Sequence, residues 1–76
     1  MARVLHLWKA DAPALAAEVL GAAVAAPGDE HTLVCLDGAP APALPAAVRV
    51  RRLAPDDLDY AGLVALIFDA DRVIAW

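Results

Sequence analysis

The chain has 76 residues, of which 62% are apolar, and its formal net charge is −4. A chain of this length forms one domain, and its acidity argues against a basic nucleic-acid-binding surface. It contains no Ser, Asn or Gln and a single cysteine, Cys35, which excludes a Ser-His-Asp triad, an N-glycosylation sequon and an internal disulfide.

The first half of the chain predicts a strand, a helix and a second strand. Residues Arg3–Trp8 form a short apolar and β-branched run that is typical of a strand. A helix is expected between an N-cap at Asp11 and Gly28, with Pro13 in its first turn. Residues His31–Leu36 predict the next strand. The apolar positions that recur at helical spacing in the predicted helix are Leu15, Val19, Leu20, Ala23 and Val24.

A proline-rich connection precedes the third predicted strand. Three prolines within residues 38–47 oppose a regular helix there. Residues Val48–Leu53 predict a strand with Arg49 and Arg51 on one face. Because parallel sheets usually carry a helix on each crossover, part of one sheet face is expected to lack helical cover. The arginine side of this strand suits such an exposed patch.

The last third predicts a helix and a final strand. Asp56 or Asp57 is the expected N-cap of the helix, and residues Arg72–Trp76 form the expected strand. The helix is apolar almost all round, and its expected buried stripe consists of Tyr60, Leu63, Val64 and Ile67. The element order predicts an α/β fold over residues 1–76, with a small, mostly parallel four-stranded sheet and two helices.

The end of the sequence also resembles a known family. Residues Leu58–Trp76, LDYAGLVALIFDADRVIAW, are similar to the closing helix and strand of the TusB/DsrH family of sulfur-relay subunits. The matching positions are Asp59, Tyr60, Val64 and Trp76, with compatible residues at Leu5, His6, Lys9, Asp37 and Gly38. The resemblance covers about 60 residues. The longer middle segment of the family is absent here, as is the first-helix cysteine of its DsrH-type members.

The resemblance implies a DsrE-type parallel α/β fold that works inside a hetero-oligomer. The implied partners are DsrE- and DsrF-like (TusD- and TusC-like) subunits, which pass persulfide sulfur towards thiolation of the tRNA wobble uridine or in sulfur oxidation. A TusB-like subunit is mainly architectural, so the chain is expected to be non-catalytic. The expected core and interface residues are Tyr60, Leu63, Ile67, Phe68 and Trp76.

Cys35 is the candidate nucleophile, and two interpretations of it stay open. A reactive thiolate near the carboxyl end of a strand could carry sulfur as a persulfide. Its place in the apolar run Leu33–Leu36 favours a buried core residue instead. A metal site is not expected, because His31 and Cys35 are about 13 Å apart along one strand and His6 adds at most one more ligand.

Polar residues follow the first two predicted strands. If these strands are parallel neighbours, then Lys9, Asp37 and Gly38 share one edge of the sheet. Lys9 could hold an anion there or pair with Asp37, and a solvated loop is the alternative. No glycine-rich phosphate loop is present, and no cofactor is expected.

Charge and hydropathy also limit location and partners. Arg49, Arg51 and Arg52 form the basic cluster, which is expected to be a polar strand face or to dock an acidic partner rather than nucleic acid. Uncharged runs reach about ten residues, half of a membrane helix, so a cytoplasmic location without membrane contact is expected. A stand-alone homo-oligomer without a relay role is an alternative that the shortened middle segment suggests.

Overall fold

The computed structural model describes residues 2–11, 14–25, 28–54 and 57–76. These residues form strands and helices in the order that the sequence predicts. The elements are β1 Arg3–Trp8, α1 Ala14–Ala25, β2 Glu30–Cys35, β3 Arg49–Arg52, α2 Tyr60–Asp69 and β4 Arg72–Ala75. β1 has its predicted bounds, β2 begins and ends one residue earlier than predicted, and β3 and β4 are shorter than predicted. No helix in this part of the chain is long and apolar enough to cross a membrane.

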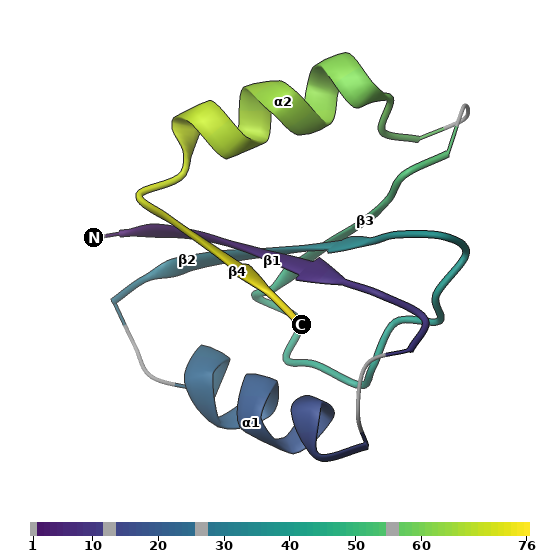
Figure 1. Ribbon diagram of the computed structural model, residues 1–76. Coiled ribbons are helices and arrows are strands. Elements are labelled where there is room, and N and C mark those ends of the chain that lie inside the picture. The colour runs from purple at the N-terminus through teal and green to yellow at the C-terminus, as the bar shows by residue number, and fades with distance from the viewer. Residues whose placement is uncertain (1, 12–13, 26–27, 55–56) are drawn as a thin grey trace.

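The four strands make one parallel sheet with the order β3-β2-β1-β4. β1 is hydrogen-bonded on both sides, and Val4 lies opposite His31 of β2 and Arg72 of β4. β3 joins the far side of β2, where Thr32 lies opposite Arg49. Figure 1 shows α1 against one face of the sheet and α2 against the other. The predicted α/β fold is therefore confirmed, with all four described strands parallel.

The sheet face on the α1 side is covered by the helix and by the connection between β2 and β3. Leu33 of β2 and Leu20 of α1 are fully buried in this apolar cluster. Ala39 in the connection is buried in it too, and Leu44 packs against it. The proline-rich connection thus takes the place of a crossover helix on this face, because its prolines lack the N–H groups that a helix needs.

The opposite face is covered by α2 and by the segment that leads into it. Its apolar cluster joins Leu5 of β1, Val34 of β2 and Leu63 of α2. Leu58, in the segment before α2, is buried in the same cluster. All four residues of β3 are exposed, and Arg49 lines a hollow on this face. Among the described residues, no second helix covers the β3 side of this face. The prediction that part of one face lacks helical cover, with the arginine side of β3 exposed there, is confirmed.

The predicted buried side of α1 is wrong in part. The buried residues are Ala16, Leu20 and Val24, spaced four apart, whereas Leu15 is 69% exposed and Val19 is also exposed. The helix is rich in alanine and apolar almost all round, so its periodicity does not select a face. The face that contains Ala16 is the one that packs against the sheet in the structure.

The predicted stripe of α2 is also wrong in part. Leu63 is buried as expected, but Tyr60, Val64 and Ile67 are exposed and Phe68 is 85% exposed. The inner side of the helix is completed by Leu66 and Ala70, which pack against the buried cluster. The expected interface residues therefore divide: Leu63 belongs to the core, Trp76 packs against the α1-side cluster, and the other three face outward.

The N-cap of α2 is Asp59 rather than the predicted Asp57. Asp59 has an extended backbone, and its Oδ1 accepts a hydrogen bond of 2.8 Å from the Gly62 N–H. Asp57 instead accepts from the Arg52 N–H at 3.0 Å and from Arg51 Nε at 2.6 Å. Those contacts tie Asp57 to β3, so the helix begins later. The other predicted cap, Asp56, lies outside the described residues, as does Pro13.

The two sides of α1 provide a matched test of the packing. Leu20→Ala is expected to lower the free energy of unfolding by about 2–5 kcal/mol, because it opens a cavity in the core. Leu15→Ala is expected to change it by no more than about 0.5 kcal/mol, because that side chain is exposed. Urea unfolding followed by circular dichroism measures both. A loss in Leu15→Ala as large as that in Leu20→Ala would contradict the exposed position of Leu15.

Candidate functional site

The predicted polar edge forms where β1 and β2 end together. Trp8 lies opposite Cys35 in the parallel register, so Lys9 and Asp37 follow the two strands at the same edge. Asp37 with a φ of 53° and Gly38 with a φ of 70° turn the chain there. Aspartate tolerates this left-handed conformation better than most residues. Both Lys9 and Asp37 are exposed, and no salt bridge in the described part of the chain joins them, so this edge is a solvated turn.

Cys35 lies in the core on the α1 side of the sheet. Its residue is 2% exposed, and it packs in the same cluster as Leu20 and Leu33. Burial raises the pKa of the thiol, and the nearby positive charge of Arg52 opposes this only in part. A persulfide carrier needs an accessible, low-pKa thiolate. The environment of Cys35 is that of a structural cysteine.

Three polar rings, two buried and one half-buried, form a row on the same face of the sheet as α1. It consists of His6 on β1, His31 on β2 and Trp76 directly after β4, and is called the His-Trp row below. The Trp76 indole Nε1 donates to His6 Nδ1 at 3.1 Å, and His6 Nε2 lies 3.0 Å from His31 Nδ1. The ring centroids of His6 and His31 are 5.2 Å apart. His6 is 0% exposed, so its polar atoms depend on these contacts.

The indole fixes the direction of every hydrogen bond in the His-Trp row. An indole N–H can only donate, so His6 Nδ1 must accept and His6 carries its proton on Nε2. That proton is donated to His31 Nδ1, which leaves the proton of His31 on Nε2. His31 Nε2 is buried and has no hydrogen-bond partner among the described residues. The row therefore has one defined pair of tautomers and ends in an unpaired donor.

The buried position of His6 lowers its pKa from 6.5 to about 4, mainly through loss of solvation and secondarily through His31. The hydrogen bonds act in the same direction. A second proton on His6 would have to sit on Nδ1, which faces the indole N–H of Trp76. His6 is therefore neutral at pH 7 and serves as a structural connection between β1 and the end of β4.

The His-Trp row does not have the donor set of a metal site. Its lone pairs on His6 Nδ1 and His31 Nδ1 accept the hydrogen bonds described above. Within residues 2–11, 14–25, 28–54 and 57–76, no group of three or more His, Cys, Asp and Glu side chains is placed to hold an ion. Cys35 lies in the apolar cluster rather than in this row.

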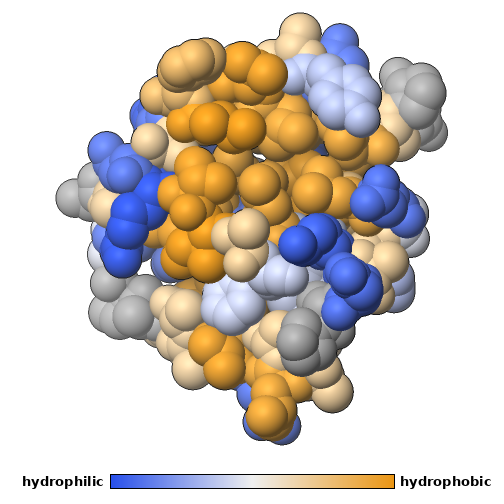
Figure 2. Space-filling view, viewed as in Figure 1, coloured by the Kyte–Doolittle hydropathy of each residue, from blue (hydrophilic) through white to orange (hydrophobic). Residues whose placement is uncertain are grey.

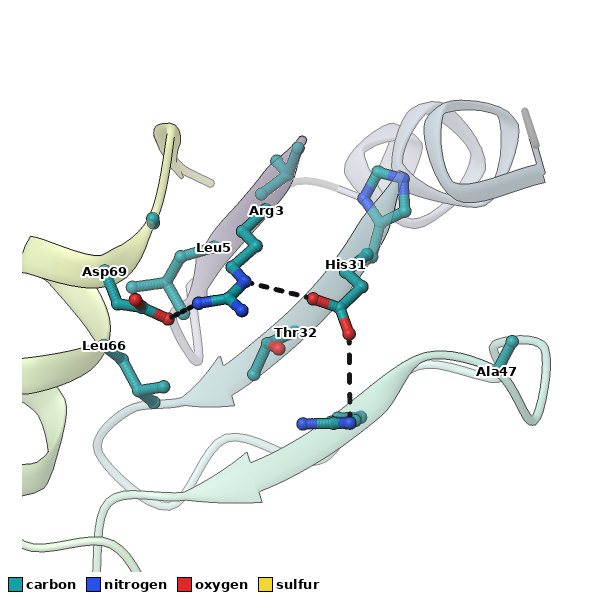
Figure 3. Close-up of a pocket in the computed structure, with 11 residues that line it drawn as sticks. Arg3, Leu5, His31, Thr32, Ala47, Leu66 and Asp69 are labelled. Atoms are coloured by element: carbon teal, nitrogen blue, oxygen red, sulfur yellow. Dashed lines mark hydrogen bonds and ion pairs between the residues drawn. The ribbon is translucent and has the colours of Figure 1, made fainter. Parts of the chain in front are cut away.

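A hollow of about 360 Å³ lies on the opposite face, between the end of α2 and β3. Its walls carry four charged side chains at the amino ends of the strands and the end of α2: Arg3, Glu30, Arg49 and Asp69. We call it the charged hollow. Arg3 pairs with Asp69 at 2.5 Å and with Glu30 at 3.3 Å, and Arg49 approaches Glu30 at 3.9 Å, as Figure 3 shows. The signs of the four charges thus alternate around it.

Comparisons with protein-family models, curated proteins and solved structures find no match to this chain. The resemblance to the TusB/DsrH family therefore stays a hypothesis that depends on the residues themselves.

The His-Trp row makes stability depend on pH. The unfolded chain binds a proton at His6 below pH 6.5, whereas the folded chain binds it only below about 4. Acidification through this interval is therefore expected to remove about 3 kcal/mol of stability, all of which is present above pH 6.5. NMR titration of the His6 ring measures the pKa directly. Trp76→Phe, which frees Nδ1, is expected to raise that pKa, and titration near 6.5 in the unaltered chain would contradict the row.

Cys35 is expected to resist alkylation in the native state. Because the thiol is buried and its pKa is raised, iodoacetamide should modify it at least about 100-fold more slowly than in denaturant. Intact-mass analysis over time gives both rates. Fast modification under native conditions would show an accessible thiolate and would favour the persulfide-carrier interpretation.

Proposed function

We propose that the chain is a non-catalytic, partner-binding subunit similar to the TusB/DsrH subunits of sulfur-relay complexes. Its partners would be DsrE- and DsrF-like (TusD- and TusC-like) chains in the cytoplasm. The complex would act in thiolation of the tRNA wobble uridine or in sulfur oxidation. The resemblance of Leu58–Trp76 motivates the proposal, and one structural observation supports it: α2 presents an apolar surface outward.

The outer α2 stripe consists of Tyr60, Val64, Ile67 and Phe68. These side chains follow the spacing i, i+4, i+7 and i+8, so they share the side of the helix that faces away from the sheet. Figure 2 shows apolar atoms gathered over α2 and continuing over the region of β4. Val73 of β4 is exposed as well. Monomeric proteins rarely leave large contiguous apolar patches exposed, and such patches mark interaction surfaces.

The buried state of Cys35 favours the architectural role over the alternative in which this chain carries sulfur. A thiol that is 2% exposed cannot meet a donor persulfide without local opening of the core. In the proposed complex the sulfur-bearing thiols belong to the partner chains. The second alternative, a stand-alone homo-oligomer without a relay role, would use the same outer α2 stripe. Only the composition of the assembly separates it from the proposal.

Co-purification tests the proposed partners. The tagged chain, expressed with the DsrE-like and DsrF-like chains of its native host, is expected to recover both in a fixed ratio. Phe68→Asp is expected to weaken the association at least about tenfold, because it replaces the most exposed apolar side chain of the stripe with a charge. Leu15→Asp is the matched control, because Leu15 is also an exposed apolar residue but lies on α1.

Two outcomes would overturn the proposal. Recovery of the chain alone, as a homogeneous homo-oligomer by sedimentation, would favour the stand-alone alternative. Equal losses for Phe68→Asp and Leu15→Asp, with both variants folded by circular dichroism, would show that the outer α2 stripe is not the contact surface.

A further inference from the structure

We propose that the charged hollow binds a small zwitterion, a molecule that carries a carboxylate and an ammonium group a few bonds apart, as an α-amino acid does. This site is separate from the outer α2 stripe. It lies at the amino ends of β1, β2 and β3, beneath the last turn of α2. Small-molecule pockets start at about 300 Å³, so the volume of the hollow fits a ligand of this size.

The lining of the hollow is more polar than apolar, and it combines charged side chains with a smaller apolar part. Leu5, Leu66 and Ala70 supply apolar surface, and Thr32 supplies one hydroxyl. Figure 3 shows Leu5 and Leu66 near the α2 side and Thr32 between Arg3 and the β3 strand. A largely polar lining of this kind suits a small charged ligand better than an apolar one.

Arg49 is the charged side chain of the hollow whose N–H donors are most available to a ligand. Its side chain is 77% exposed, and its ion pair within the described part of the chain is the 3.9 Å approach to Glu30. Arg51, two residues along the same strand face, contrasts with it, because its Nε donates to Asp57 at 2.6 Å. A guanidinium has five N–H donors in a planar fork that matches a carboxylate. Arg49 therefore has most of its donors available at the rim of the hollow.

The alternation of charge selects a zwitterion over a simple ion. Going around the hollow, the order is Asp69 negative, Arg3 positive, Glu30 negative and Arg49 positive. The long gap between Glu30 and Arg49 is the weak contact in this series. A ligand whose ammonium meets Glu30 and whose carboxylate meets Arg49 replaces this contact as the exposed Arg49 side chain moves aside, and it keeps the signs alternating. A lone anion would lie beside Glu30 and a lone cation beside Arg49, and each would meet a like charge.

The hollow exists because of the unusual connection between β2 and β3. That connection packs on the α1 side, with Ala39 buried there, so the β3 half of the α2 face stays open. Ala47, near the end of the connection, lines the hollow at the amino end of β3. A crossover helix on the α2 face would fill this space.

NMR titration of the isotope-labelled chain with glycine tests the site. The expected result is saturable shifts of the amides of Thr32 and Arg49, with a dissociation constant in the millimolar range that is typical of a few exposed charged contacts. Arg49→Gln is expected to weaken binding about tenfold, because it removes the charged fork. Arg51→Gln is the matched control on the same strand face, and its effect is expected to stay within about twofold.

The half-ligands acetate and methylammonium complete the experiment. Each is expected to bind at least about tenfold more weakly than glycine, because each pairs with only one of Arg49 and Glu30 and meets the like charge of the other. Acetate binding as tightly as glycine would show a plain anion site and would overturn the proposal. No saturable shift up to about 50 mM glycine, or equal losses in the two arginine variants, would overturn it as well. None of these results bears on the partner-binding role of α2.

Discussion

The fold depends on the parallel pairing of β1 with both β2 and β4. Two consecutive residues of β1 serve the two faces of the sheet: Leu5 is buried in the α2-side cluster, and His6 is buried in the His-Trp row. A shift of the register by one residue would exchange them, placing an imidazole in an apolar core and a leucine among polar rings. The row thus adds a specific polar constraint to a sheet whose apolar residues alone tolerate several registers.

Much of the architecture could be predicted because strand signals here are short and well separated. The β-branched runs, the Asp37-Gly38 turn and the prolines of the β2–β3 connection each have a local physical cause, and all appear in the structure. The inner faces of the helices could not be predicted. Both helices are apolar almost all round, so the choice between Leu15 and Ala16, or between Tyr60 and Leu66, is made by the fit to the sheet rather than by periodicity.

Of the polar features, those with a local cause could be predicted and those that depend on the packing of distant segments could not. The exposed arginine side of β3 follows from strand alternation and the missing helix, both of which are local properties. The His-Trp row joins one residue from each of β1 and β2 with the residue that follows β4, and no spacing in the sequence indicates it. The contact between the two histidines does follow from the strand pairing: with β1 and β2 in parallel register, His6 and His31 lie on one face of the sheet as diagonal neighbours. Using it requires the register, which the sequence leaves open.

The order of the strands also has a consequence for how the chain is made. Arg3 and Asp71 are 68 residues apart, yet the Arg3 N–H donates to the Asp71 carboxylate at 2.8 Å, and β1 takes its second partner from β4. β1 therefore keeps one edge unpaired until β4, which follows it by almost 70 residues, has also been synthesised. Contacts of such long separation slow folding and leave strand edges exposed in the meantime. During that interval the unpaired edge of β1 is open to strand addition by other polypeptides.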